Sequence, residues 1–423
     1  NLDGNFSLKV PANATVVISY IGMKTQEIAI KGKSKIDVTL SDDAKALDEV
    51  VVIGYGTAKR KDITGSVASV NSETLAAIPV ASATEALQGK MAGVQITTTE
   101  GSPDAQMSIR VRGGGSITQS NEPLFIVDGF PVESISDIPP TDIESIDVLK
   151  DASSTAIYGA RGANGVIIVT TKSGKEGKVS VSYNAYYAWK KVAKTLDVLS
   201  ASDYTKWQYE LAQLTNKNDD YIKYFGNYQD LDMYDNVATN DWQDLTFGRT
   251  GHSFNHNLSI NGGSDKFKYS FSYSHIDDKA IMQMSDYARD NLNLKLNHKP
   301  LKNVSLDFSA RFSKTKINGG GSNDANSSLN TDKRLKYSLL YTPYPVPGIS
   351  DALNADEEDA NSLLINPLIS LRDNDTRKER INYNLAGSIT WEIIKDLKLK
   401  AEVGYDDYRN NACLLYTSDA ADE

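Results

Sequence analysis

The sequence predicts a mainly β protein with three parts: the remnant of a small β-sandwich, an α+β domain, and the first part of a transmembrane antiparallel β-barrel. Short strands separated by Pro, Gly and Asn occupy residues 1–40, and a mixed helix and strand pattern covers 63–175. Long segments that alternate apolar and polar residues begin at 176. The 423 residues, 40% hydrophobic and 24% charged, are enough for two or three folded domains.

Charge and cysteine content exclude several classes of function. The net charge of −10 argues against a nucleic-acid-binding protein, because such proteins depend on clustered Lys and Arg. The single cysteine, Cys413, can form neither an internal disulfide nor a cysteine metal site. Because Asn1 already lies inside a β-like pattern, we expect the chain to be a fragment.

A run of four β-branched residues at 50–53 follows the acidic linker 41–49. Composition alone favours a buried strand. Its position between a linker and a mixed domain favours a strand that stays available to another protein, which would bind it by adding it to a sheet. The basic residues 59–61 would keep such a released strand soluble.

Two helix starts are predicted in the mixed domain. Ser82 and Glu85 have capping-box spacing, and Gly89 is placed to end that helix. Thr141 and Glu144 repeat the spacing after two prolines.

Strands are predicted around these helices. Residues 123–132 predict a hairpin that turns at Asp128 and Gly129, and residues 165–174 predict a strand buried on both faces. Three glycines predict tight turns: Gly159, Gly162 and Gly165.

Seven segments after residue 176 place apolar and aromatic residues on one face and Ser, Asn and Lys on the other. They are 179–189, 254–260, 267–273, 292–296, 304–312, 381–391 and 397–405. A soluble β-sandwich also alternates, but the long polar face, and tight turns that alternate with long connections such as 317–335 and 343–380, favour a barrel. Barrels that hold an internal plug have about 22 strands, so we expect the chain to continue past 423.

No catalytic, cofactor or metal site is predicted. Serine nucleophile elbows and zinc-helix motifs are absent, and "GYGTAK" at 54–59 lacks the helix of a dinucleotide fingerprint. His252 and His256 share a strand face about 13 Å apart, too far to bind one metal. His275 and His298 have no evident partners, and the acidic segment 351–361 is interpreted as an external loop.

Five motifs in order resemble the plug of the SusC-like (SusC/RagA) TonB-dependent transporters of the Bacteroidetes outer membrane. They are "GYGTAKRKDITGSVASV", "ALQGKMAGVQI", "IRVRGGGS", "EPLFIVDGFPV" and "IESIDVLKDASSTAIYGARGANGVIIVTTKSG". Residues 4–30 resemble the end of the carboxypeptidase-regulatory-like domain that precedes the plug, and residues 241–282 resemble early barrel strands.

The resemblance implies the organisation of the chain. It gives the C-terminal part of the carboxypeptidase-regulatory-like domain at 1–40, a linker with the TonB box at 41–62, the plug at 63–175 and the N-terminal part of the barrel at 176–410. The TonB box would consist of Glu49, Val50, Val51, Val52 and Ile53. Residues 411–423 break the alternation and contain Cys413, and the hypothesis is that they are a non-native read-through.

The resemblance also implies the function. A barrel of about 22 strands, embedded in outer-membrane lipid, would import a glycan or peptide together with a SusD-like surface lipoprotein. TonB, with its ExbB/ExbD energy complex, would pull the TonB box from the periplasm. Two alternatives remain: a receptor for a siderophore or cofactor, and a passive cell-surface protein for binding or adhesion.

Overall fold

The computed structural model describes residues 8, 10–11, 14–18, 26–30, 38–39, 50–53, 56–59, 67–76, 80, 82–98, 107–114, 120–319, 333–350, 366–395 and 397–416. The chain divides into two compact units, residues 1–66 and 67–423.

The first unit contains two small antiparallel sheets. Strand β1 (Thr15–Ile18) pairs with β2 (Gln26–Ala29), which confirms two of the four strands predicted in residues 1–40. The other two predicted segments lie mostly outside the described residues. Strand β3 (Val50–Ile53) pairs with β4 (Gly56–Lys59).

The second unit begins with a five-stranded sheet, which we call the plug sheet; we refer to residues 67–171, which lie within the predicted plug of 63–175, as the plug. Its strands are, in spatial order, β5 (Val67–Asn71), β10 (Ile143–Leu149), β11 (Val166–Thr171), β8 (Leu124–Val127) and β9 (Phe130–Val132). Only the β11 and β8 pair is parallel. Strands β6 (Val94–Thr98) and β7 (Met107–Val111) form a separate hairpin.

Short helices lie between the plug strands, and the first two of them contribute side chains to one hydrophobic core. They are α1 (Ser72–Ala76), α2 (Ala83–Ala86), η2 (Pro140–Asp142), α3 (Ala152–Thr155) and η3 (Ala156–Gly162). Leu75 and Leu87 pack with Ile109, Ile146 and Ile167 in this core, all less than 3% exposed. Apolar burial of this extent is the main stabilisation of a small domain.

Most of the predicted plug elements are confirmed. Ser82 caps α2, because its Oγ accepts the Glu85 N–H at 3.2 Å. The hairpin between β8 and β9 turns at Asp128 (φ 50°) and Gly129 (φ 94°), as a two-residue loop with two positive φ angles requires. Strand β11 is buried between β10 and β8.

The helix predicted from Thr141 and Glu144 is wrong. Only a single 3-10 turn forms at Pro140–Asp142, without a side-chain cap, and β10 begins at Ile143. The capping-box spacing is a local signal, whereas β10 pairs with strands on both sides and buries Ile146 and Val148 completely. Pairing and burial therefore override the local preference.

All three predicted glycines depend on the absence of a side chain, and at Gly162 a Cβ would lie 2.9 Å from the carbonyl oxygen of Thr155. Gly165 has φ +92°, and a Cβ there would lie 3.0 Å from the Val111 side chain. Gly159 has φ +59°, a conformation that costs other residues free energy.

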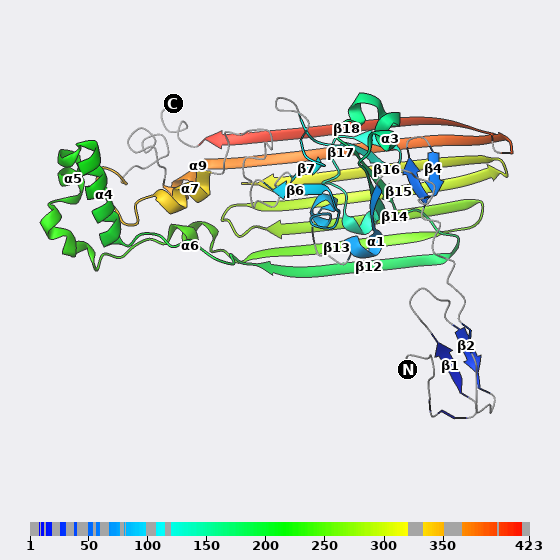
Figure 1. Cartoon of the computed structure of the whole chain (residues 1–423), viewed down its shortest axis with the longest axis horizontal. Helices are drawn as coiled ribbons and strands as arrows, with labels where there is room; N and C mark the ends of the chain where they lie inside the picture. The colour runs from blue at the N-terminus through cyan, green and yellow to red at the C-terminus, as the bar shows by residue number, and fades with distance from the viewer. Residues whose placement is uncertain are drawn as a thin grey trace. The chain divides into compact units, whose positions relative to one another are not determined.

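Seven antiparallel strands in chain order form the second sheet, which we call the wall (Figure 1). They are β12 (Gly177–Lys190), β13 (Gly251–Gly263), β14 (Phe267–Lys279), β15 (Asp286–Leu301), β16 (Val304–Asn318), β17 (Asn374–Ile394) and β18 (Leu397–Tyr416). Tight turns join the strands at one end, and the described parts of the long connections, 191–250, 333–350 and 366–373, lie at the other (Figure 1). All seven predicted strands are confirmed.

The strand boundaries differ from the prediction at one end of the wall. β17 already begins at Asn374 and β18 continues to Tyr416, with Asn374 paired to Tyr416. The predicted end near residue 405 is therefore wrong. The side-chain alternation stops there because the ends of both strands carry charged residues such as Arg377 and Arg409. Backbone pairing nevertheless continues. That residues 411–423 are non-native stays a prediction.

The long connections contain helices that the sequence analysis did not predict. They are α4 (Ala201–Thr215), α5 (Asn218–Phe225), η4 (Tyr228–Tyr234), α6 (Trp242–Phe247), α7 (Lys333–Leu340) and α9 (Pro367–Asp373). Tyr204 of α4 and Phe225 of α5 pack with Tyr344 of the second connection. Among the helices described in this structure, none has the length and apolar character needed to cross a membrane.

Candidate functional site

The two faces of the wall differ in polarity and burial. Buried polar residues occupy one face: Ser253, Asn257, Ser270, Ser272, Ser274, Arg289, Asn291, Asn293, Ser309, Ser313, Thr315 and Asn384. Exposed apolar and aromatic residues occupy the other: Val179, Val181, Tyr183, Phe254, Phe267, Leu292, Phe308, Leu385, Trp391, Leu399, Val403 and Tyr405. The plug covers the polar face. This arrangement is the reverse of a soluble sheet and is typical of a barrel in a membrane.

The apolar face forms an oblique band. On β12 the last apolar residue of the band is Trp189, and the strand registers place it level with Lys279 of β14. The limit of the band on β18 is Tyr405, which lies level with Phe271 of β14. The limit thus shifts by eight residues (279 minus 271) over the six steps from β12 to β18.

The shift gives the inclination of the strands to the normal of the band. At about 3.4 Å per residue and about 4.8 Å per strand step, the inclination is about 43°. Strands of membrane barrels tilt by about 35–45°. An apolar band that is level with a bilayer therefore fits this wall.

Asp128, in the turn of the β8–β9 hairpin, joins the plug to the wall. Its carboxylate accepts hydrogen bonds from Lys295 Nζ of β15 at 2.9 Å, from the Thr171 N–H at 2.9 Å and from Thr171 Oγ1 at 2.6 Å. Burial alone would raise the pKa of Asp128, but the cations Lys295 and Arg311 and the hydrogen bonds from Thr171 lower it. The carboxylate is therefore a buried anion held by the wall.

Gly404 on β18 makes room for a side chain of the β8–β9 hairpin. A Cβ on Gly404 would clash with the ring of Phe130, the first residue of β9. The ring thus occupies the space that any other residue would fill. The hairpin contacts the wall from β15 to β18.

A second carboxylate of the plug, Asp142, meets the wall through neutral hydrogen-bond donors. It accepts hydrogen bonds from Ser272 Oγ at 2.8 Å and from Asn257 Nδ2 at 3.4 Å. Burial raises the pKa of Asp142, and these hydrogen bonds, together with the positive charges of Lys172 and Arg289, oppose the rise only in part. Arg289 of β15 donates to the carbonyl of Ser136 at 2.8 Å.

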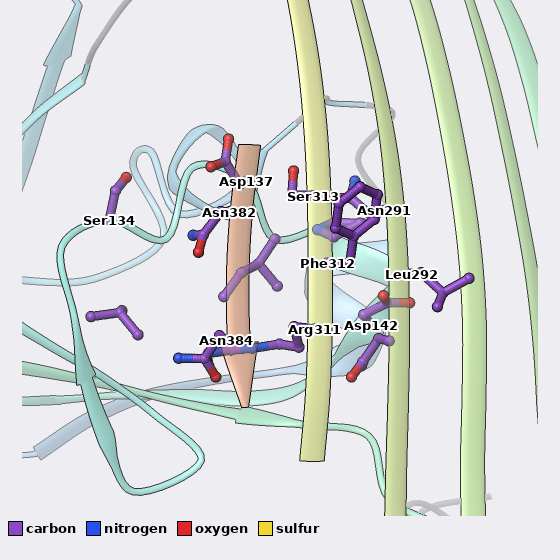
Figure 2. A pocket seen from close by; sticks show the side chains of 14 residues that line it. Ser134, Asp137, Asp142, Asn291, Leu292, Arg311, Phe312, Ser313, Asn382 and Asn384 are labelled. Atoms are coloured by element: carbon purple, nitrogen blue, oxygen red, sulfur yellow. Dashed lines mark hydrogen bonds between the residues drawn. The ribbon is translucent and has the colours of Figure 1, made fainter. Parts of the chain in front are cut away.

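A pocket lies between plug and wall (Figure 2), with about 470 Å³ of space not filled by atoms, part of it open to solvent. Val132, Ser134, Asp137, Ile138, Pro139 and Asp142 of the plug line it, with Asn291, Leu292, Asn293, Arg311, Phe312, Ser313, Asn382 and Asn384 of the wall. Figure 2 shows Arg311 reaching from the yellow strand β16 towards Asn384; its Nη2 donates to Asn384 Oδ1 at 2.8 Å.

Three buried polar atoms around this pocket have no hydrogen-bond partner among the described residues. They are Arg311 Nη1, Asn293 Oδ1 and Asn382 Oδ1. Buried polar groups are rarely left unpaired, so the pocket suits water or another polar molecule. The sequence analysis did not find this site, because its residues come from plug and wall segments far apart in the chain.

The histidines form no metal site. His252 Nδ1 bonds to Tyr187 OH at 2.8 Å, and the neighbouring His256 bonds to Tyr183. The expectation that His275 and His298 lack partners is wrong: their Nδ1 atoms bond to Asp290 at 2.8 Å and to the Lys266 carbonyl at 3.2 Å. Within the described ranges, no group of three His, Cys, Asp or Glu side chains could hold a metal. The acidic segment 351–361 lies outside them.

The predicted TonB box falls partly in the described chain. Residues 50–53 form β3, in register with β4 from Val50 opposite Lys59 to Ile53 opposite Gly56. Glu49 lies outside the described residues. The role of these residues stays a prediction.

Comparisons with known proteins agree with this architecture. Residues 59–166 match the TonB-dependent Receptor Plug Domain, and residues 1–52 match the CarboxypepD_reg-like domain. The TonB-dependent receptor SusC of Bacteroides thetaiotaomicron is 40% identical over 299 residues, which cover 68% of this chain and 28% of that protein. The TonB-dependent receptor P3 of Formosa agariphila is 35% identical over 419 residues, covering 96% of this chain and 38% of that protein.

Solved structures of transporters also resemble this chain. The RagAB peptide importer in its open-open state superposes with a TM-score of 0.67 at 27% identity, over 86% of this chain and 43% of that one. The ferric citrate transporter FecA, at 13% identity and a TM-score of 0.51, shares the fold alone. This chain spans about 28–38% of the length of the two curated relatives. It belongs to the SusC-like TonB-dependent receptors, and it carries their plug and a seven-stranded part of their barrel wall.

Proposed function

We propose that the complete protein is an active transporter of the outer membrane. It imports an oligomeric nutrient through its barrel when the plug is displaced. The observation that carries this proposal is the plug, which is held against the polar face of the wall by Asp128 and Asp142 while an apolar band faces outward. A domain that fills a barrel must move before a large substrate can pass.

TonB, with ExbB and ExbD, supplies the force. It binds residues 49–53 from the periplasm, where the N-terminal domain also lies. The extended backbone of β3 supports this assignment, because a strand at the edge of a two-stranded sheet can pair with a further strand.

The substrate is a glycan or a peptide, delivered by a SusD-like surface lipoprotein. Similarity to SusC and to the RagAB peptide importer supports this class of substrate and partner. The alternative is a siderophore receptor, which a 28% identity to the Rhizobactin receptor over 38% of this chain favours less. A passive adhesin would need no strand for an energy-coupling partner.

Deletion of residues 49–53 in the complete receptor tests the proposal. Growth is measured with maltooligosaccharides as carbon source, with tryptic peptides as nitrogen source, or with a ferric siderophore as iron source. We expect growth to be lost in one of the first two conditions at normal surface levels of the protein. The matched control, Val52→Ala, shortens one side chain and keeps the backbone intact. Loss of growth on the siderophore alone would favour the alternative, and normal growth of the deletion strain in all three conditions would overturn active transport.

A further inference from the structure

Lysines are concentrated at the tight-turn end of the wall. The segments that join the strands there carry ten lysines and four acidic residues, although the whole chain has a net charge of −10. They are 172–178, 264–268, 298–303 and 392–400. The opposite ends of the strands are nearly balanced, with nine basic and eight acidic residues in 186–190, 251–256, 275–279, 286–290, 314–318, 374–380 and 406–410. An excess of positive charge thus marks one end of the wall only.

Four exposed lysines lie in or beside the three hairpin turns at this end, and we call them the turn lysines. They are Lys266, Lys299, Lys302 and Lys395. The ion pairs at this end of the described chain involve other lysines, Lys175 with Glu144 and Lys400 with Glu402. The ammonium groups of the turn lysines therefore face water or a ligand.

Backbone hydrogen bonds join neighbouring hairpins close to their turns. The Lys299 N–H donates to the Lys266 carbonyl at 2.7 Å, and the Glu392 N–H donates to the Asn303 carbonyl at 2.8 Å. The first bond places Lys266 beside Lys299. The second places the turn that contains Lys302 beside the end of β17. The turn lysines thus form a continuous series along the end of the wall where the tight turns lie (Figure 1).

Exposed apolar side chains accompany the turn lysines. Phe267, Leu301 and Ile394 are 43%, 62% and 63% exposed, and each is the direct neighbour of a turn lysine in the chain. The strand registers place these three residues on the apolar face of the wall. A lysine beside an exposed apolar residue is typical of a bilayer–water interface, where the stem lies along apolar surface and the ammonium group reaches the headgroups.

The depth of the turn lysines agrees with such an interface. On β18 the apolar residues extend from Tyr405 to Leu397, eight positions (405 minus 397), which is about 27 Å along the strand. With the strand inclined by about 43°, this corresponds to about 20 Å across the band. The apolar band of a membrane barrel is about 25 Å tall. Lys395, two positions beyond Leu397, therefore lies where the headgroups begin.

We propose that the turn lysines bind the headgroups of acidic phospholipids in the leaflet that faces the periplasm. The phosphodiester accepts from the ammonium groups, and Phe267, Leu301 and Ile394 contact the acyl chains. Lys266 and Lys299, adjacent through their backbone bond, can bind one headgroup together. A zwitterionic phospholipid carries its own cation beside the phosphate and is attracted less. The inference rests on the proposed function only for the identity of the leaflet.

A protein of the periplasm is the other possible occupant of a basic surface. The exposed apolar neighbours favour lipid, because they lie at the border of the apolar band and continue its face. A soluble protein that bound the lysines would leave these side chains to be covered by the bilayer in any case.

Native mass spectrometry of the complete receptor in detergent tests the proposal. The probes are dioleoylphosphatidylglycerol, which is acidic, and dioleoylphosphatidylcholine, which has the same acyl chains and no net charge. The Kd of the first bound lipid is measured for each. We expect the acidic lipid to bind about 5-fold more tightly if its headgroup contacts one lysine and about 30-fold more tightly if it contacts two.

Two fourfold variants provide the comparison. The first combines Lys266→Gln, Lys299→Gln, Lys302→Gln and Lys395→Gln, and its preference for the acidic lipid should fall below about 2-fold. The matched control makes the same change of charge at exposed lysines of the long connections: Lys194→Gln, Lys206→Gln, Lys217→Gln and Lys336→Gln. The control should keep the wild-type preference. Both variants must first show a heat-modifiable, folded barrel.

Three outcomes would overturn the proposal. One is a wild-type receptor that binds both lipids equally, which would leave a protein as the partner of the lysines. Another is a preference that persists in the first fourfold variant. The third is displacement of the acidic lipid by an equal concentration of glycerol 1-phosphate, which would indicate a site for free phosphate. Because the measurement needs neither TonB nor a nutrient, failure of active transport would leave it unchanged.

Discussion

Substitution of Val52 by proline tests which edge of β3 a partner strand would use. The register of Ile53 opposite Gly56 leaves two residues between β3 and β4, as in a two-residue hairpin. The pair that closes such a hairpin is hydrogen-bonded, and bonded pairs alternate with unbonded ones. Ile53 and Val51 therefore direct their backbone groups towards β4. Val50 and Val52 direct theirs to the free edge.

The size of the effect follows from this geometry. The N–H and C=O groups of Val50 and Val52 can form up to four hydrogen bonds with an added strand, each worth about 0.5–1.5 kcal/mol net. Proline at 52 removes one donor and leaves a carbonyl of the partner unpaired, at a cost of about 1–3 kcal/mol. The affinity for the periplasmic domain of TonB should fall by about 5- to 150-fold.

Isothermal titration of the detergent-solubilised complete receptor with the periplasmic domain of TonB measures this affinity. Val52→Ala is the control, because it shortens the side chain and keeps the backbone donor. Val51→Pro removes a donor that faces β4 and should weaken the hairpin more than the complex. If Val52→Pro binds as the wild-type protein does, an added strand on the free edge of β3 is refuted.

Three further predictions concern the plug. Burial raises the pKa of Asp142 in the folded protein above the ordinary value of 3.8, which applies to the unfolded chain. Protonated Asp142 therefore stabilises the plug fully below pH 3.8, and this stabilisation is lost as the pH rises through the raised pKa. The thermal midpoint of the plug should fall over this range, and Asp142→Asn should remove the dependence. Gly404→Ala should destabilise plug docking by about 1–3 kcal/mol in urea unfolding, since its Cβ would meet Phe130; unchanged stability would contradict the contact. Ser82→Ala should cost about 1 kcal/mol and speed amide exchange in α2.

The wall could be predicted from sequence because each strand repeats the same period of two over an apolar band. The ends of β17 and β18 could not be predicted from the sequence. Charged residues such as Glu379 replace the outward apolar residues there, while backbone pairing continues. The helix predicted at Thr141 failed for a related reason, since capping spacing is a short-range signal and β10 is fixed by its neighbours. The cap of α4 was available as a signal: Ser200 Oγ accepts the Asp203 N–H at 3.1 Å.

The ion pair between Asp128 of the plug and Lys295 of the wall could not be predicted. Asp128 was identified only as a turn residue, and 167 positions separate it from Lys295. No local pattern joins residues so distant. A weak signal existed: Lys295 is a lysine on a face otherwise rich in Ser and Asn, where a long cation requires a partner to be buried.

The burial of this ion pair has a consequence for the environments in which the receptor works. Dissolved salt screens charges that water reaches and has little effect on buried ones. The outward-facing pair of Lys314 and Glu379, each more than a third exposed, should weaken as ionic strength rises. The pair of Asp128 and Lys295 should not. Plug retention would then be the same in dilute and in saline surroundings, whereas the charged rim of the wall would respond to both.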